Sequence, residues 1–199
     1  MLSLDTYQIE TIVKISELCS ERGIDLWWND ISGDTKSARA VLKEFPKLGY
    51  VLCHNLAPDR SLAQSHMKFL LEGNPVEQLT SYFSSRIQSL AGLKNPLLLD
   101  PCFGFSKSRD QNLFLCQNLF QLVKQFSLPW VLGISRKSFL RPEGESYAQH
   151  ELATELQHVL WLDHWQNTLP CNEYYLRLHN PIVAKTHTFW THNVSSCQT

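Results

Sequence analysis

The chain has 199 residues, a hydrophobic fraction of 43% and a formal net charge of −1, which suits one globular domain with a sizeable core. A net charge this close to zero gives no sign of the basic surface that nucleic-acid binding requires. No apolar run approaches the ~20 residues that span a bilayer, and residues 1–6 lack the basic and apolar regions of a signal peptide. We therefore expect a cytoplasmic protein without nucleic-acid or membrane partners.

Six short segments, most of them nearly continuous in hydrophobic residues, alternate with longer amphipathic segments. Such runs are typical of parallel strands that are buried on both faces. In chain order, they predict strands at 2–4, 24–28, 50–53, 96–99, 129–134 and 174–178.

Three of the intervening segments carry apolar stripes at helical spacing. A fourth helix is expected over 151–165. Together with the six strands, these segments indicate βα units in strict alternation and hence a parallel sheet with right-handed crossovers. The stripes are formed by Ile9, Ile12, Val13 and Leu18, by Val76, Leu79, Phe83, Ile87 and Leu90, and by Leu113, Leu119, Leu122, Val123 and Phe126.

An α/β barrel and an open doubly wound sheet both accommodate six βα units. No glycine-rich phosphate loop follows any predicted strand, which argues against the nucleotide-binding open sheets. A TIM-type (β/α) barrel has eight units in about 250 residues. We therefore expect an incomplete barrel of about six units, in one domain over 1–199, with the first two strands missing.

The cysteines and histidines show no metal-binding spacing. The six cysteines stand far apart without a CxxC pair, and the eight histidines include no HExxH pattern. They are therefore interpreted as isolated thiols in a reducing compartment, and no protein-built metal site is predicted.

Unusual polar residues fall immediately after the predicted strands. Taken singly, each has an ordinary explanation, because Asp and Asn often cap helices and a surface Arg or Lys is usually solvated. In parallel α/β proteins, however, these strand ends meet at one face, where active sites are built. The residues are Asp5, Asn29, Asp30, His54, Asn55, Asp100, Ser135, Arg136, Lys137, Arg177 and His179.

Two kinds of chemistry are represented at this predicted face. Asp5, Asn29 and Asp100 supply acceptors and an amide, which suit a flat heterocycle with adjacent N–H donors. The second group is cationic and suits phosphate or pyrophosphate. Its members are Arg136, Lys137, Arg177 and His179. A donor-rich ring attached to an anionic leaving group satisfies both.

At these positions the sequence resembles dihydropteroate synthase. Residues 97–107 read LLLDPCFGFSK, similar to the family's LLLDPGFGFGK, and residues 132–139 read LGISRKSF, similar to its GxSRKSF motif. Shorter matches are SLDT at 3–6, NDISG at 29–33 and RLH at 177–179. The motifs occur in family order and cover nearly the whole chain; DPxFGF together with SRKS is the specific combination.

The resemblance implies a transferase of folate biosynthesis. That enzyme condenses 6-hydroxymethyl-7,8-dihydropterin diphosphate with p-aminobenzoate to give 7,8-dihydropteroate and pyrophosphate, with Mg²⁺ bound mainly through the substrate diphosphate. Asp100 and Lys137 are the implied catalytic residues, and Ser135 and Arg136 are placed on the p-aminobenzoate side. Arg177 and His179 are placed on the diphosphate. The implied pterin-binding residues are Asp5, Asn29, Asp100, Phe105, Gly133 and Lys137.

Some residues depart from the family pattern. Cys102 and Ser106 stand where the family has glycine, which predicts strain wherever the backbone has a positive φ. Asn55 replaces a methionine and Asn180 an aspartate. The segment 151–165 lacks the small residues of the family's penultimate helix, which bears on the possible homodimer. The family's Mg²⁺-linked Asn has no counterpart.

Two further hypotheses compete with the synthase. One is a degenerate pterin-binding paralogue without synthase activity. The other is a pterin-dependent methyltransferase, which the SRKS and RLH motifs disfavour because a methyl carrier has no diphosphate to release. A six-stranded barrel would also leave two open sheet edges, so we expect the free-standing chain to be inactive.

Overall fold

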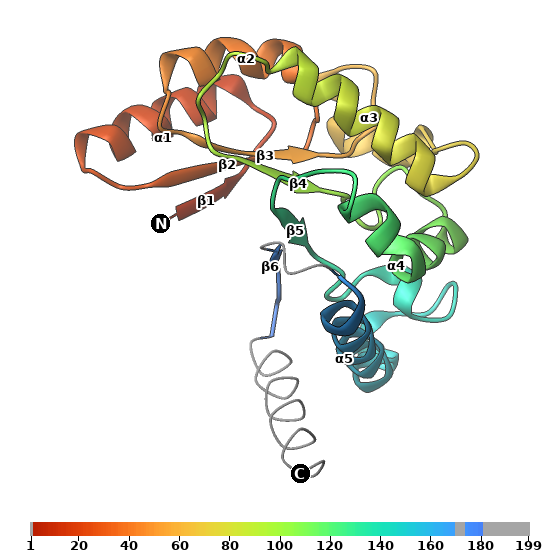
Figure 1. Cartoon of the computed structure of the whole chain (residues 1–199). Coiled ribbons are helices and arrows are strands. Elements are labelled where there is room, and N and C mark those ends of the chain that lie inside the picture. Colours follow the sequence, from red (N-terminus) through yellow and green to blue (C-terminus); the bar gives the residue numbers. More distant parts are fainter. Residues whose placement is uncertain (1, 170–173, 181–199) are drawn as a thin grey trace, which may run out of the picture.

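The computed structural model describes residues 2–169 and 174–180, and within them six parallel strands form one curled sheet (Figure 1). The strands follow one another in space as they do in the sequence, in the order β1 to β6. They are β1 (Leu2–Asp5), β2 (Leu26–Asp30), β3 (Gly49–Cys53), β4 (Leu97–Asp100), β5 (Trp130–Leu132) and β6 (Tyr174–Leu176). This arrangement is an incomplete TIM-type barrel, as the alternation of segments predicts.

Five α-helices and three 3₁₀ segments connect the strands, and α1 to α4 cover the outer face of the sheet (Figure 1). The helices are α1 (Ile9–Glu21), α2 (Thr35–Glu44), α3 (Pro75–Ser89), α4 (Arg109–Val123) and α5 (Glu151–Thr168). The 3₁₀ segments are η1 (Arg60–Lys68), η2 (Ser138–Leu140) and η3 (Tyr147–Gln149). The part of the sixth unit that would follow β6 lies outside the described residues. None of the described helices is long and apolar enough to cross a membrane.

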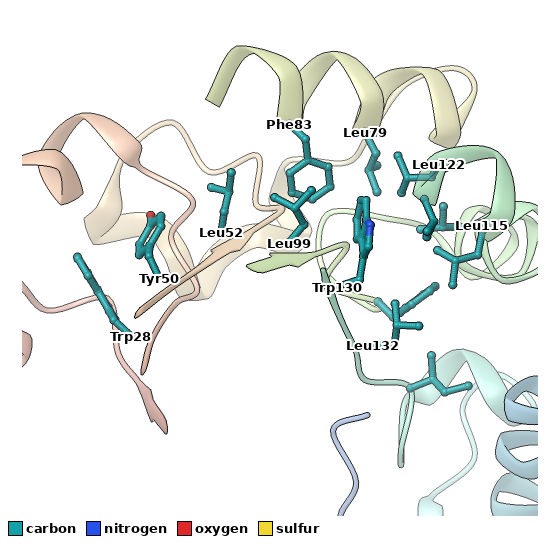
Figure 2. Packing of buried hydrophobic residues seen from close by; sticks show 14 of the residues in the cluster. Trp28, Tyr50, Leu52, Leu79, Phe83, Leu99, Leu115, Leu122, Trp130 and Leu132 are labelled. Carbon is teal, nitrogen blue, oxygen red and sulfur yellow. The ribbon is translucent and has the colours of Figure 1, made fainter. Parts of the chain in front are cut away.

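The main core lies between the outer face of the sheet and the helices. Alternate strand residues point outward, and Figure 2 shows the outward set packing against side chains of α3 and α4. Phe83 of α3 lies edge-on to Trp130 of β5, with ring centroids 5.3 Å apart. Other members of this cluster are Trp28, Tyr50, Leu52, Leu79, Leu99, Leu115, Leu122 and Leu132.

The inward-facing residues line a hollow of about 200 Å³ on the concave side of the sheet. A small apolar cluster of Val51, Cys53, Leu98, Cys102 and Val131 occupies part of this side. The concave side therefore carries both apolar side chains and, at the strand ends, the polar residues of the candidate site.

The sequence predictions hold for all six strands, with corrections at their ends. Ile24 is not part of β2, because its backbone N–H bonds back to Cys19 at the end of α1. The prediction that Leu18 packs in the core is wrong, because its side chain is 45% exposed. Asp5, Asn29, Asp30 and Asp100 are the final residues of their strands rather than the first residues after them. Helix α5 extends to Thr168 and exposes Leu152, Leu156 and Leu160.

One buried ion pair fixes the loops that follow β2 and β3. Asp30 is fully buried, and Arg60 of η1 donates to both of its carboxylate oxygens at 2.8 and 2.9 Å. Tyr50 and Ser32 donate to the same carboxylate, while Arg60 also reaches the carbonyl of Tyr7. Asp30 is thus a structural anchor, in line with the ordinary explanation for a single strand-end aspartate.

Replacement of Arg60 by alanine should be strongly destabilising, because it leaves the buried Asp30 carboxylate without its cation. Breaking a buried pair in this way costs about 3–5 kcal/mol. Urea unfolding of Arg60→Ala should show a loss in this range, whereas the exposed Arg109→Ala control should stay within about 0.5 kcal/mol of the parent chain. Equal stability of the two variants would contradict the structural role of the pair.

Candidate functional site

The ends of β2, β4 and β6 are joined by one hydrogen-bonded network around Asp100. This carboxylate is buried; its Oδ1 accepts from the backbone N–H of Cys102 at 2.7 Å and its Oδ2 from Arg177 at 3.2 Å. Arg177 also donates to Oδ1 of Asn29 at 3.0 Å. A buried carboxylate needs donors of this kind to remain charged, so the network holds three strand ends in register.

Asn29 is fully buried but only half satisfied. Its Oδ1 accepts from Arg177 and from the thiol of Cys53, whereas its Nδ2 has no hydrogen-bond partner in the part of the chain that the structure describes. An unpaired buried donor costs about 1–3 kcal/mol. Such a group in a native fold calls for an explanation, and an acceptor on a bound ligand is one.

The loop after β4 brings an aromatic ring and a cation to the same face. Phe105 stacks on His66 with ring centroids 3.8 Å apart, and the ammonium of Lys137 lies 5.2 Å from the Phe105 ring centroid. A Cβ at Gly104 would come within 3.4 Å of the Lys137 side chain. A Cβ at Gly133 would come within 3.3 Å of Arg177, which explains the small residue there.

The remaining predicted residues assemble less completely. Ser135 is buried, and its Oγ lies 3.3 Å from the backbone N–H of His179, which donates to it, and 3.1 Å from Nδ1 of the His179 ring. Arg136 is exposed and its guanidinium lies over Tyr147, away from this network. Asp5 is exposed at the end of β1, opposite Asn29 in the strand register. Asn55, which stands where the family has methionine, has a structural role, because its amide donates to the carbonyls of Ile31 and Ala63.

A buried Lys107–His54 pair lies beneath the loop after β4. The Nζ of Lys107 lies 3.0 Å from Nδ1 of His54 and donates to the carbonyls of Cys102 and Phe105 at 3.2 and 2.8 Å. Burial lowers the pKa of Lys107 to about 7. Burial, and then the charge of Lys107, hold the pKa of His54 well below its usual value. The pair thus supports the loop on which Phe105 lies.

The sequence of residues 1–169 matches the model of a family described as "Pterin binding enzyme". The chain belongs to the pterin-binding enzyme family. Among curated relatives, it is 31% identical over 147 residues to dihydropteroate synthase type-2 of Escherichia coli, covering 70% of this chain and 50% of that protein. It is 30% identical over 145 residues to the folate synthesis bifunctional protein of Chlamydia trachomatis, covering 70% of this chain and 30% of that protein.

Solved structures of this family share the fold. Dihydropteroate synthase from Thermus thermophilus, in complex with 6HMPPP, aligns with a TM-score of 0.72 and 21% identity over 96% of this chain and 71% of that one. The Xanthomonas albilineans enzyme with 4-aminobenzoic acid aligns with a TM-score of 0.70 and 21% identity, over 96% of this chain and 63% of that one. The chain spans half or less of the length of the two curated relatives named above.

Sequence reasoning placed most of the family's motif residues but missed three features of the site. Lys107 directly follows the DPCFGFS segment. Its position after this aromatic loop is the only sequence signal that it would be buried. Arg60 carries no motif signal at all. The closeness of Cys53 and Cys102 depends on the pairing of β3 with β4, in which Cys53 lies opposite Asp100; no local pattern encodes it.

Both residues that stand in the family's glycine positions have a positive φ, 49° at Cys102 and 52° at Ser106, which is the condition under which strain was expected. Ser106 offsets the strain, because its Oγ accepts from the N–H of Leu56 and donates to the carbonyl of His66. We expect Ser106→Gly to be less stable than Cys102→Gly by about 1 kcal/mol or more in urea unfolding, since only the former loses two hydrogen bonds. The opposite order would contradict this assignment.

The lowered pKa of Lys107 predicts a pH-dependent stability. In the folded chain the amine is neutral above about pH 7, whereas in the unfolded chain it stays protonated up to about pH 10. The unfolded state binds more protons in this interval, so stability rises with pH, by up to about 1.4 kcal/mol per unit, and is lost as the pH falls towards 7.

Replacing Lys107 by methionine should flatten this rise. The measurement is the free energy of unfolding in urea between about pH 7 and about pH 8.5, an interval below the titration of tyrosine; the thiols, which begin to titrate there, are common to both chains. The groups that contribute to the Lys107 environment, Asp100, Cys53, Cys102 and Lys137, remain in the variant. An identical slope for the parent and Lys107→Met would show that the lysine stays charged in the folded chain.

Proposed function

We propose that this chain binds the pterin ring of 6-hydroxymethyl-7,8-dihydropterin diphosphate and supplies this part of the active site for the condensation with p-aminobenzoate that defines dihydropteroate synthase. The observation that carries the proposal is the Asp100–Arg177–Asn29 network with its unpaired Asn29 amide. A pterin ring presents adjacent N–H donors and ring acceptors, which match a carboxylate and a free amide side by side. The similar dihydropteroate synthase structures in complex with 6HMPPP and with 4-aminobenzoic acid support the same substrates.

Each named residue has a role that follows from its position. Asp100 accepts from the ring and stabilises positive charge that develops on the pterin as the methylene C–O bond breaks. Lys137, beside Phe105, holds the edge of the ring. The bond's electron pair leaves with the diphosphate, the amine of p-aminobenzoate forms the new C–N bond, and the amine then loses a proton.

Arg177 links the two halves of the proposed site. Its guanidinium donates to Asp100 and Asn29, and the side chain is still 41% exposed, so part of the fork remains open to an anion. His179 and Ser135, paired with each other, lie on the same strand-end face. We place the departing pyrophosphate against Arg177 and His179, and p-aminobenzoate towards Ser135 and Arg136.

The described residues do not form a Mg²⁺ site. Mg²⁺ requires near-octahedral oxygen ligands, whereas the one cluster of possible metal ligands here contains two thiols and a carboxylate. No catalytic step is therefore assigned to Mg²⁺ on this chain's own residues; the resemblance assigns the ion to the substrate diphosphate. A cytoplasmic location and a homodimer likewise remain predictions.

Calorimetric titration with 6-hydroxymethylpterin diphosphate tests the binding half of the proposal. We expect saturable binding by the parent chain and a loss of at least about tenfold in affinity for Asp100→Asn, because a charged hydrogen bond to the ring is removed. The matched control is Asp110→Asn, in the exposed first turn of α4, which should bind like the parent. Equal affinity of the two variants would contradict the assigned role of Asp100.

A turnover assay with p-aminobenzoate separates the synthase from its main alternative. The alternative is a pterin-binding protein without synthase activity, and the observation that favours it is Cys102, a strained thiol in the loop that holds Asp100. Dihydropteroate formation that is lost in Asp100→Asn supports the synthase. Saturable pterin binding with no product formed supports the alternative.

A further inference from the structure

Three potential metal ligands meet at the ends of β3 and β4. The Sγ atoms of Cys53 and Cys102 and a carboxylate oxygen of Asp100 all lie within 4.8 Å of one another, and all three residues are buried. Cys53 and Asp100 are directly opposite in the β3–β4 register. The sequence predicted no metal site because the two cysteines are far apart in the chain; strand pairing brings them together.

Cys102 packs in the apolar cluster of the concave side, but its backbone conformation is unusual for a cysteine. It takes φ 49°, a conformation that favours glycine, and the resemblance has glycine there. The bond from its N–H to Oδ1 of Asp100 holds the residue in this conformation, with its thiol beside that of Cys53. A cysteine in a strained conformation, with its sulfur close to a second sulfur and a carboxylate, indicates that the thiol has a binding role.

The donor set matches a thiophilic cation. Zn²⁺ binds cysteine sulfur at about 2.3 Å and carboxylate oxygen at about 2.0–2.2 Å, which places ligand atoms of a tetrahedral site roughly 3.3–3.8 Å apart. The three atoms are already within 4.8 Å, so small side-chain shifts suffice. Three protein ligands with a fourth position open is the pattern of exchangeable rather than purely structural zinc sites.

We propose that Cys53, Asp100 and Cys102 form a binding site for a thiophilic divalent cation such as Zn²⁺. Binding replaces the two thiol protons with metal–sulfur bonds and releases those protons to solvent. Oδ1 of Asn29 accepts from the Cys53 thiol at 3.3 Å, and this hydrogen bond is lost when the thiol gives up its proton. The site differs in kind from a Mg²⁺ site, because sulfur donors select soft metals.

Burial is consistent with thiols that stay protonated until a metal arrives. Burial, and then the adjacent Cys102, raise the pKa of the Cys53 thiol well above its usual value. A neutral pair costs less to bury than two thiolates, and a bound cation supplies the charge that thiolates need.

The site also has a consequence that rests on the proposed function. Asp100 is shared between the cation and the pterin ring. Bound Zn²⁺ should therefore prevent the pterin from binding and inhibit the proposed reaction. The cation would also compete with Arg177 for the same carboxylate.

Cobalt titration of the reduced, metal-free full chain tests the site directly. We expect one Co²⁺ per chain, with the near-ultraviolet absorption of sulfur-to-cobalt charge transfer, and displacement by Zn²⁺ but not by Mg²⁺. Cys102→Gly should lose this band, and it should remain folded because glycine suits its φ. Cys53→Ala should also lose the band, whereas Cys19→Ala, in α1, should keep it.

Three results would overturn the proposal. One is the absence of a charge-transfer band in the parent chain, and another is an unchanged band in Cys102→Gly. The third is loss of both thiols to a disulfide in the presence of saturating Zn²⁺. The cobalt spectra do not involve pterin, so they separate this proposal from the proposed function. Competition between Zn²⁺ and 6-hydroxymethylpterin diphosphate, abolished in Cys102→Gly, then tests the link between them.

Discussion

The candidate site depends on how a carboxylate at the end of β4 is kept charged inside the protein. Asp100 is buried, and a buried charge is costly unless donors surround it. One donor comes from the loop that follows, through Cys102, and the other from β6, through Arg177. Arg177 then reaches Asn29 on β2. The requirement to satisfy one carboxylate thus determines where the loop after β4 and the last described strand must lie.

The two strand-end aspartates show how the same physics yields different roles. Asp30 receives two donors from Arg60 and further ones from Tyr50 and Ser32, so its acceptors are occupied by the protein itself. Asp100 has fewer donors, and beside it the Asn29 amide has an unpaired N–H. We interpret the carboxylate whose acceptors are all hydrogen-bonded within the protein as structural, and the unpaired amide beside Asp100 as a place for a ligand.

Much of the fold could be predicted from the sequence, because each strand of a parallel sheet that is buried on both faces needs a continuous apolar run. The strand-end residues followed from topology, since parallel strands deliver their ends to one edge. Leu18 and Ile24 show the limit: apolar character alone did not reveal that Leu18 is exposed or that Ile24 belongs to the turn after α1.

The parts of the site that sequence reasoning missed all depend on long-range pairing. Lys107 and His54 come from different strand–loop junctions, and the low pKa of Lys107 exists only because folding buries its amine. Cys53 meets Cys102 only through the register of β3 and β4. The glycine positions, by contrast, could be read from the family pattern, whereas their positive φ values are known only from the structure.

A double-mutant cycle between Asp100 and Arg177 tests most directly whether the strand ends are assembled as described. The free energy of unfolding in urea is measured for the parent, Asp100→Asn, Arg177→Met and the double variant. A direct contact predicts a coupling of at least about 1 kcal/mol between the two substitutions. Additive effects, with no coupling, would mean that β6 does not bring Arg177 to the end of β4, and the account of the site would be wrong.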